Sequence, residues 1–207
     1  MLRTPYVFSG MSLKTSYRFI APFYDVAIER ATRAARLRNL ARLPEAPARV
    51  LIGGAGTGLD LPGLPAQHQY VAQDITSAML LRARPRCQGL EVGLVQGDSM
   101  ALPFADAGFD CVVLHLILAV VPRPERCLAE AVRVLKPGGR ILVFDKFLRR
   151  GQFAPVRRLF SPLIGRLATR TDVVFEDVLA EVPGVRKIRD EDALAGGWFR
   201  LIELQKD

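Results

Sequence analysis

One short run of residues constrains the fold of this chain more than any other. Residues 50–58, Val-Leu-Ile-Gly-Gly-Ala-Gly-Thr-Gly, have the pattern of an apolar strand that breaks into a loop with glycine at 54, 56 and 58. Glycine allows positive φ angles and lets a ligand approach the main chain closely. Two further apolar stretches follow, and they end in Asp74 and Asp98. A glycine loop and two acids after successive strands predict the nucleoside-binding edge of a doubly wound sheet.

The other apolar patterns alternate between strands and helices along the chain. This alternation predicts an α/β fold, a three-layer α/β/α sandwich of Rossmann-like type with a seven-stranded, mostly parallel sheet whose last strand is antiparallel. We expect helix 124–135 to be capped by glycine within residues 136–139, Lys-Pro-Gly-Gly, and helix 77–84 to end at Pro85. The expected strands are 49–53, 70–73, 92–96, 109–114, 140–144, 185–188 and 198–204, and the expected helices are 23–43, 77–84, 124–135 and 153–167.

The positive charge of the chain is concentrated in two segments. The net charge is +8, with nine Lys and Arg against three acids in residues 1–50 and seven against none in residues 146–170. Residues 51–145, which hold the glycine loop and both acids, are nearly balanced at eight against nine. The distribution predicts an anionic partner or surface that contacts these two segments.

Length and composition exclude several classes of protein. A chain of 207 residues suits one domain with an ample core. The longest apolar run, residues 111–121, is interrupted by His115 and is shorter than the roughly 20 residues of a spanning helix. No signal-peptide pattern opens the sequence. The three cysteines show no C-x-x-C spacing, so we expect reduced thiols, no metal site and a cytoplasmic protein.

The glycine spacing distinguishes between ligands. A dinucleotide fingerprint, G-x-G-x-x-G, needs glycine at position 59, where this chain has Leu59. The loop therefore favours a ligand without a pyrophosphate over a dinucleotide. Asp74 is placed to accept from both hydroxyls of a ribose, or to cap the helix that begins near Ser77. Asp98 is placed to accept from an adenine amine beside Ser99 and Met100, or to stabilise a turn.

At this point the chain resembles a known family, the class I S-adenosylmethionine-dependent methyltransferases. The resemblance rests on VLIGGAGTG (50–58), AQDITSAML (72–80), QGDSMALPFADAGFD (96–110) and VVPRPERCLAEAVRVLKPGGRILV (120–143). It implies S-adenosylmethionine as cofactor, with the glycine loop facing the methionine part, Asp74 on the ribose, Asp98 on the adenine amine and Met79 near the adenine face or in the core. The cofactor-binding residues that it implies are Gly54, Ala55, Gly56, Gly58, Asp74, Ile75, Met79, Asp98, Ser99, Met100 and Leu114.

One position departs from the family pattern. The family usually has Glu or Asp two residues before the first loop glycine, where this chain has Ile52. The usual acid helps to anchor the amino group of the cofactor. Its absence implies weaker binding of the cofactor, replacement by another acid such as Asp60 or Asp25, or a relative that has lost methyl transfer.

Two segments bear on the substrate. Residues 17–25, Tyr-Arg-Phe-Ile-Ala-Pro-Phe-Tyr-Asp, resemble the opening of bacterial phospholipid and quinone methyltransferases, in which it folds over the cofactor. Tyr17 and Tyr24 are therefore candidates for a tyrosine near the sulfonium, or for packing residues. The segments after the fourth and fifth strands are similar to soluble phosphatidylethanolamine N-methyltransferases, although Asp145-Lys146 replaces their Asn-His pair.

The resemblance divides the single domain into functional segments. Residues 1–45 form a lid and substrate helix, and residues 146–184 form a basic insertion that faces the substrate or membrane. A basic apolar helix over 153–167 can lie on an anionic membrane, or it packs on the sheet as an ordinary cap. His115 is a candidate base or a core histidine, His68 has no expected chemical role, and Asp145 is placed to meet a cationic or hydroxyl-bearing head group.

These observations predict a cytoplasmic methyltransferase, peripheral on the inner face of the membrane, that acts on a lipid amine or similar amphiphile. A methyltransferase for a soluble small molecule, such as a quinone precursor, and a cofactor-binding relative without activity are the alternatives. No cluster of base-stacking aromatic residues indicates a nucleic-acid partner.

Overall fold

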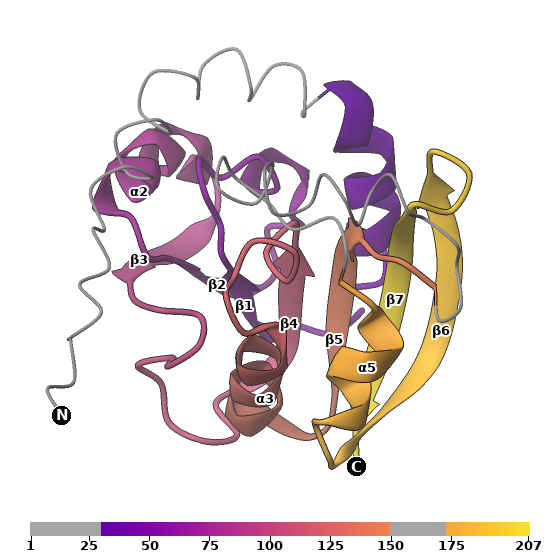
Figure 1. Ribbon diagram of the computed structural model, residues 1–207. Helices are drawn as coiled ribbons and strands as arrows, with labels where there is room; N and C mark the ends of the chain where they lie inside the picture. Colours follow the sequence, from indigo (N-terminus) through magenta and orange to yellow (C-terminus); the bar gives the residue numbers. More distant parts are fainter. Residues whose placement is uncertain (1–29, 150–172) are drawn as a thin grey trace, which may run out of the picture.

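The residues that the computed structural model describes, 30–149 and 173–207, contain seven strands in one sheet. The strand order is β3-β2-β1-β4-β5-β7-β6 (Figure 1). β7 runs antiparallel to β5 and β6, and all other pairs are parallel, which confirms the predicted topology. The strands are β1 (Arg49–Gly53), β2 (Gln69–Asp74), β3 (Glu91–Gln96), β4 (Phe109–His115), β5 (Leu135–Lys146), β6 (Val185–Leu194) and β7 (Phe199–Lys206).

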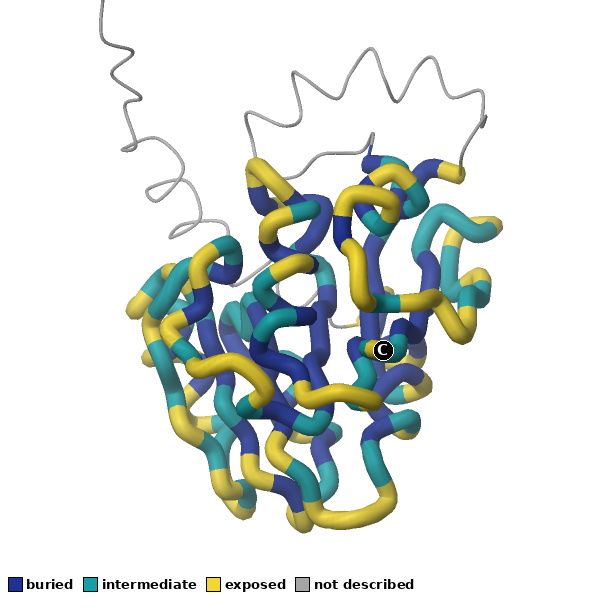
Figure 2. Tube along the Cα trace, turned by 90° about the horizontal axis from the view of Figure 1, so that it is seen from below, coloured by how far each residue is buried: buried dark blue, intermediate teal, exposed yellow. Residues whose placement is uncertain are grey.

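Helices cover both faces of this sheet. Successive side chains of a strand point to opposite faces, so in β1 Leu51 packs with α3 (Pro124–Val134) and α5 (Phe175–Ala180). Val50 and Ile52 pack on the opposite face, with the helix over residues 30–40 and α2 (Ser77–Ala83). Figure 1 shows α3 and α5 in front of the sheet, and in Figure 2 the buried residues follow the central strands. The predicted three layers are therefore present.

The strand order reverses between β1 and β4. β1 pairs with β2 on one side and β4 on the other, so the chain after β1 and the chain after β4 diverge from neighbouring strand ends. Such a switch point leaves a crevice outside the carboxyl ends of the strands. The glycine loop and both predicted acids follow strands at this edge.

Several element boundaries differ from the sequence prediction. Residues 136–139 do not cap α3, because α3 ends at Val134 and β5 begins at Leu135. A Cβ at Gly139 would lie 2.9 Å from the carbonyl oxygen of Asp110, so the glycine there allows β5 to approach β4 closely. As predicted, the α-helix α2 ends before Pro85, with Ala83 as its last residue. The chain continues from α2 into the 3-10 helix η2 (Arg84–Cys87), whose first turn tolerates a proline because its N–H would be unpaired.

The helix at the start of the described chain and the last strands also differ in extent. The described part of the first helix is residues 30–40, and the helix ends at Leu40, before the predicted Leu43. Between the glycine loop and β2, a stretch that the structure describes in full, the only helical segment is the 3-10 helix η1 (Leu61–Gly63). β6 extends from Val185 to Leu194, well beyond the predicted Ile188, because its polar residues pair with β7 along its whole length. An exposed strand of this kind carries no apolar alternation from which its length can be predicted.

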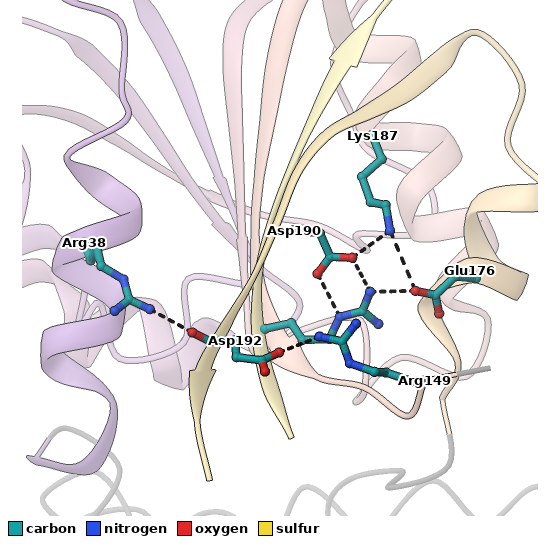
Figure 3. A network of polar contacts seen from close by, with 7 residues as sticks. Arg38, Arg149, Glu176, Lys187, Asp190 and Asp192 are labelled. Carbon is teal, nitrogen blue, oxygen red and sulfur yellow. Dashed lines mark hydrogen bonds and ion pairs between the residues drawn. The ribbon is translucent and has the colours of Figure 1, made fainter. Parts of the chain in front are cut away.

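Ion pairs fasten the last two strands to α5, as Figure 3 shows. Arg200 of β7 is fully buried and donates from Nη2 to Glu176 of α5 at 2.6 Å and from Nε to Asp190 of β6 at 3.0 Å. Arg149, which follows β5, pairs with Asp192 at 2.5 Å. These contacts join the end of β5, the tip of β6 and α5 to one another.

The chain on the two sides of residues 150–172 comes together. The N–H of Leu148 donates to the carbonyl of Val173 at 2.8 Å, and the rings of Phe147 and Phe175 lie 5.0 Å apart. The chain therefore leaves and returns at one place beyond the carboxyl end of β5. The predicted helix 153–167, and the part of helix 23–43 before residue 30, lie outside the described residues. Within the described ranges, no helix has the length and hydropathy needed to cross a membrane.

Candidate cofactor and active site

The glycine loop needs its glycines for two different reasons. All three have positive φ, at 66° for Gly54, 55° for Gly56 and 77° for Gly58. A Cβ at Gly54 would lie 2.6 Å from the Ile117 side chain, and one at Gly58 would lie within 3 Å of Ala83. A Cβ at Gly56 would meet nothing within 4 Å, so its backbone faces open space. Gly54 and Gly58 are required for packing, whereas Gly56 leaves room for a ligand.

Asp74 joins the end of β2 to this loop. Its Oδ2 accepts from the N–H of Gly56 at 2.9 Å and its Oδ1 accepts from the N–H of Thr76 at 2.8 Å. Burial raises the pKa of this carboxyl, although the two amides oppose the shift. Each oxygen retains a lone pair for a further donor. Asp74 therefore positions the loop and can accept from a bound ligand as well.

Gln73 is a functional residue that the sequence analysis missed. It is fully buried, and its Oε1 accepts from Ser99 Oγ at 2.9 Å and from the N–H of Gly54 at 3.4 Å. Its Nε2 donates to the carbonyl of Gly97. One side chain thus links the turns after β1 and β3. A polar residue at the end of an apolar strand, directly before the acid, was the signal available in the sequence.

The turn after β3 presents Asp98. Its Oδ1 accepts from the N–H of Met100 at 2.8 Å, which is the turn contact considered above, and its remaining lone pairs can serve a ligand. Met100 is half-buried and packs against the larger core cluster. Ile75 is 60% exposed beside this edge, which leaves an apolar surface for a ligand to cover, and Met79 on α2 is half-buried.

Ala55 and Leu114 contribute mainly to the framework of this edge. The N–H of Ala55 donates to the carbonyl of Gln73 at 2.8 Å. The Leu114 side chain is buried in the larger core cluster, so β4 offers a ligand only its backbone at this residue. The structure therefore places the predicted cofactor residues at one edge and divides them between framework and surface.

His115 ends β4 with both ring nitrogens occupied inside the protein. Nδ1 lies 3.0 Å from Oδ2 of Asp60, and Nε2 accepts from Nδ2 of Asn39 at 3.0 Å. The side chain of His115 is 3% exposed. These contacts leave no ring nitrogen for a proton from a substrate, so the geometry opposes the predicted role of His115 as a base.

Asp60 is the acid closest in sequence to the glycine loop. Its Oδ1 accepts from Nη1 of Arg36 at 2.8 Å, in addition to the contact with His115. Burial raises its pKa, but the contacts with His115 and with the Arg36 guanidinium outweigh burial and hold the pKa at about 2. Ile52, where the family has an acid, is buried in an apolar cluster with Leu61. The buried acid of this region is therefore at 60.

Asp145 is buried at the carboxyl end of β5. Its Oδ2 accepts from the N–H of Ala119 at 3.0 Å and its Oδ1 from the N–H of Lys146 at 2.8 Å. Burial raises its pKa to about 6, against the effect of these amides. The carboxylate holds the segment after β4 against the end of β5. This contact differs from the predicted contact with a head group, because the group is inside the protein. The predicted Tyr17, Tyr24 and Asp25 lie outside the described residues.

Comparison with known proteins identifies the family. Residues 51–143 match the family described as "Methyltransferase domain". The chain is 32% identical over 188 residues to a phosphatidylethanolamine N-methyltransferase of Cereibacter sphaeroides, covering 88% of this chain and 92% of the relative. It is 32% identical over 189 residues to a demethylmenaquinone methyltransferase of Renibacterium salmoninarum, covering 85% and 77%. A solved methyltransferase of Thermotoga maritima, described as a possible histamine N-methyltransferase, has a TM-score of 0.68 at 21% identity, over 94% of this chain and 100% of that chain.

The fold and these relatives define the class: the chain belongs to the class I S-adenosylmethionine-dependent methyltransferases. It is an enzyme of that class, and the prediction of S-adenosylmethionine as cofactor is confirmed. The residues at the carboxyl edge fit this cofactor on structural grounds, because Gly56 leaves open space and Asp74 and Asp98 keep acceptor capacity.

Proposed function

We propose that this methyltransferase acts on the amine of a phospholipid head group of the phosphatidylethanolamine type, at an anionic membrane surface. The observation that carries the proposal is the alignment with a phosphatidylethanolamine N-methyltransferase over 88% of this chain and 92% of the relative. It extends well beyond residues 51–143, which match the methyltransferase family as a whole. The likeness thus includes the segments outside the cofactor half.

The charge distribution supports a membrane surface. Residues 146–170 carry seven Lys and Arg and no acid, interleaved with Phe, Leu and Ile. Both ends of residues 150–172 lie beyond the carboxyl end of β5, the edge at which the glycine loop also lies. Each basic residue near an anionic leaflet contributes about 1 kcal/mol of binding free energy. The basic, apolar composition of this part of the sequence supports binding to an anionic head-group surface.

The chemistry requires mainly alignment. When bound, S-adenosylmethionine supplies a methyl group already activated by the sulfonium. We propose that Asp74 accepts from the ribose hydroxyls, Asp98 accepts from the adenine amine and Gly56 allows close approach of the main chain. Tyr17 and Tyr24 remain candidates for residues near the sulfonium. The protein then orients the acceptor and excludes water, and a dry site favours the neutral form of an amine.

Asp145 acts in this scheme as a positioning residue. It fixes the segment after β4 through Ala119, and its charge stands at the end of β5, where the resemblance to phosphatidylethanolamine N-methyltransferases implies an Asn-His pair. A carboxylate at this place attracts a cationic head group towards the edge, whereas the dry site beside the cofactor favours the neutral amine that accepts the methyl group. It is not placed to touch the substrate directly.

The test combines lipid turnover with membrane binding. The purified protein is incubated with labelled S-adenosylmethionine and vesicles that contain phosphatidylethanolamine and phosphatidylglycerol. We expect label in the phosphatidylethanolamine fraction, and sedimentation with the vesicles that decreases as salt is raised. The double variant R157A/R158A should sediment less while its affinity for S-adenosylhomocysteine is unchanged. Unlabelled lipid, with no sedimentation at low salt, would refute the proposal.

A quinone precursor is the second candidate acceptor. The alignment with a demethylmenaquinone methyltransferase has the same identity and covers 85% of this chain. The assay distinguishes the two when a demethylated quinone is added to the vesicles, because label would then enter the quinone and not the phospholipid fraction.

A further inference from the structure

A buried polar cluster lies directly beside the glycine loop. Arg36 and Asn39 come from helix 30–40, Asp60 follows the loop and His115 ends β4. Contacts of 2.8 to 3.0 Å run from Arg36 to Asp60, from Asp60 to His115 and from His115 to Asn39. The cluster thereby joins three segments that are far apart in the sequence.

The cluster is on the face of the sheet where the family acid would point. Ile52 of β1 is in register with Val113 of β4, and both pack in the core cluster that includes Leu40 and Leu61. His115 is two residues beyond Val113, so its side chain points to the same face. The charged groups missing at position 52 are therefore supplied on the same face by Asp60 and its partners.

Two buried side-chain atoms of this cluster have no hydrogen-bond partner. Arg36 uses Nη1 for Asp60, and its Nη2 is buried without a hydrogen bond. Asn39 uses Nδ2 for His115, and its Oδ1 is likewise buried without a hydrogen bond. An amide NH2 can only donate, so Nε2 of His115 accepts and the ring proton is on Nδ1, facing the carboxylate of Asp60. This assignment leaves Asn39 Oδ1 as a free acceptor.

The unpaired Nη2 of Arg36 is a charged hydrogen-bond donor, and the unpaired Oδ1 of Asn39 is a neutral acceptor. Residues three apart on a helix lie on the same face, so the unpaired donor of Arg36 and the unpaired acceptor of Asn39 come from one side of helix 30–40. Burying a polar group without a partner is costly, and costlier when it is charged. Leu116, next to His115, has φ of 57°, an uncommon conformation for a non-glycine residue that often marks functional sites. A charged donor next to a neutral acceptor matches an amino-acid zwitterion.

We propose that Arg36 and Asn39 receive the amino-acid end of the cofactor, the carboxylate at Arg36 Nη2 and the ammonium at Asn39 Oδ1. Asp60 and His115 are the positioning residues that hold these two side chains. These residues replace the acid at position 52 that, in the family, helps to anchor the amino group of the cofactor. The inference rests on the cofactor and not on the lipid acceptor proposed above.

A truncated ligand tests this assignment. S-adenosylhomocysteine carries the amino-acid end, and 5′-methylthioadenosine has the same adenosyl part without it. Calorimetry measures both affinities for the wild-type protein and for Arg36→Lys, which keeps a charge beside Asp60 but loses the forked second arm. We expect Arg36→Lys to weaken S-adenosylhomocysteine about tenfold or more, and to leave methylthioadenosine unchanged. Asn39→Ala should show the same selectivity.

Two controls separate this result from other causes. Arg33→Met removes an exposed arginine from the same helix and should change neither affinity. Asp74→Ala should weaken both ligands, because its role is at the ribose. Equal losses for both ligands in Arg36→Lys, or no loss for either, would overturn the inference. A failure of lipid methylation would refute the proposed acceptor and leave these affinities as they are.

Discussion

Replacement of Asp60 by Asn measures how strongly the buried cluster depends on its carboxylate. In Asp60→Asn, Arg36 keeps its charge but loses its ionic partner, with a side chain only 5% exposed. Removing one member of a buried ion pair costs about 3–5 kcal/mol, because the other charge remains buried and unpaired. We therefore expect urea denaturation at pH 7 to show a loss of about 3 kcal/mol in the free energy of unfolding.

The titration of Asp60 gives an independent magnitude. Its pKa falls from 3.8 to about 2 on folding, which corresponds to about 2 kcal/mol of stability at neutral pH. Because the folded pKa is below the unfolded one, this stabilisation is complete above about pH 4 and is lost as the pH falls towards 2. The difference between wild type and Asp60→Asn should therefore shrink across that interval.

A matched control and a double variant complete the experiment. Asp106 also pairs with an arginine, but its side chain is 78% exposed, so Asp106→Asn should cost less than about 1 kcal/mol. The double variant D60N/R36M should recover part of the loss, since it removes the unpaired charge as well. A loss below about 1 kcal/mol for Asp60→Asn, or a difference that stays constant down to low pH, would refute the role assigned to this pair.

Three further predictions follow from the geometry. Gly56→Ala should cost about 1–2 kcal/mol of stability, since only the backbone is strained, yet it should strongly weaken the binding of S-adenosylhomocysteine. Gly58→Ala should lower the melting temperature further, because its Cβ meets Ala83. Asp145, with its pKa raised from 3.8 to about 6, binds a proton more tightly when folded, so wild type should lose about 3 kcal/mol relative to Asp145→Asn as pH rises from 4 to 7; parallel profiles would contradict this. Arg200→Ala should cost about 3 kcal/mol in denaturation, because it removes a buried ion-pair partner and leaves Lys187 to pair with both Glu176 and Asp190. The exposed Arg189→Ala should change stability by less than about 1 kcal/mol.

Local patterns predicted the parts of the fold that depend on local physics. Residues 50–53 are apolar because the strand is buried there, and the loop residues are glycines because their φ angles are positive. The acids lie at or just after the ends of the next two strands, where polar side chains reach the edge of the sheet. The sheet order follows from the alternation of such segments, because right-handed crossovers leave few arrangements. The switch point, and the edge at which we propose that the cofactor binds, were predictable for the same reason.

Boundaries and side-chain partners were not predictable in this way. The residues 136–139 belong to β5 because Gly139 packs against β4, a contact that no local preference indicates. The length of β6 is determined by pairing with β7 and not by its polar sequence. The hydrogen-bond partners of Gln73 are Gly54 and Ser99, which come from other segments, so the strand pattern around Gln73 could not predict them.

The sequence alone determined the class of fold, the cofactor edge and the absence of the usual acid at Ile52. Only the tertiary structure decided which groups take the place of that acid. Asp60 is 24 residues from Arg36 and 55 from His115, and Asn39 is 76 residues from His115. A local pattern reports the conformation and burial of one segment, whereas a partner for a buried charge depends on which segments the fold brings together.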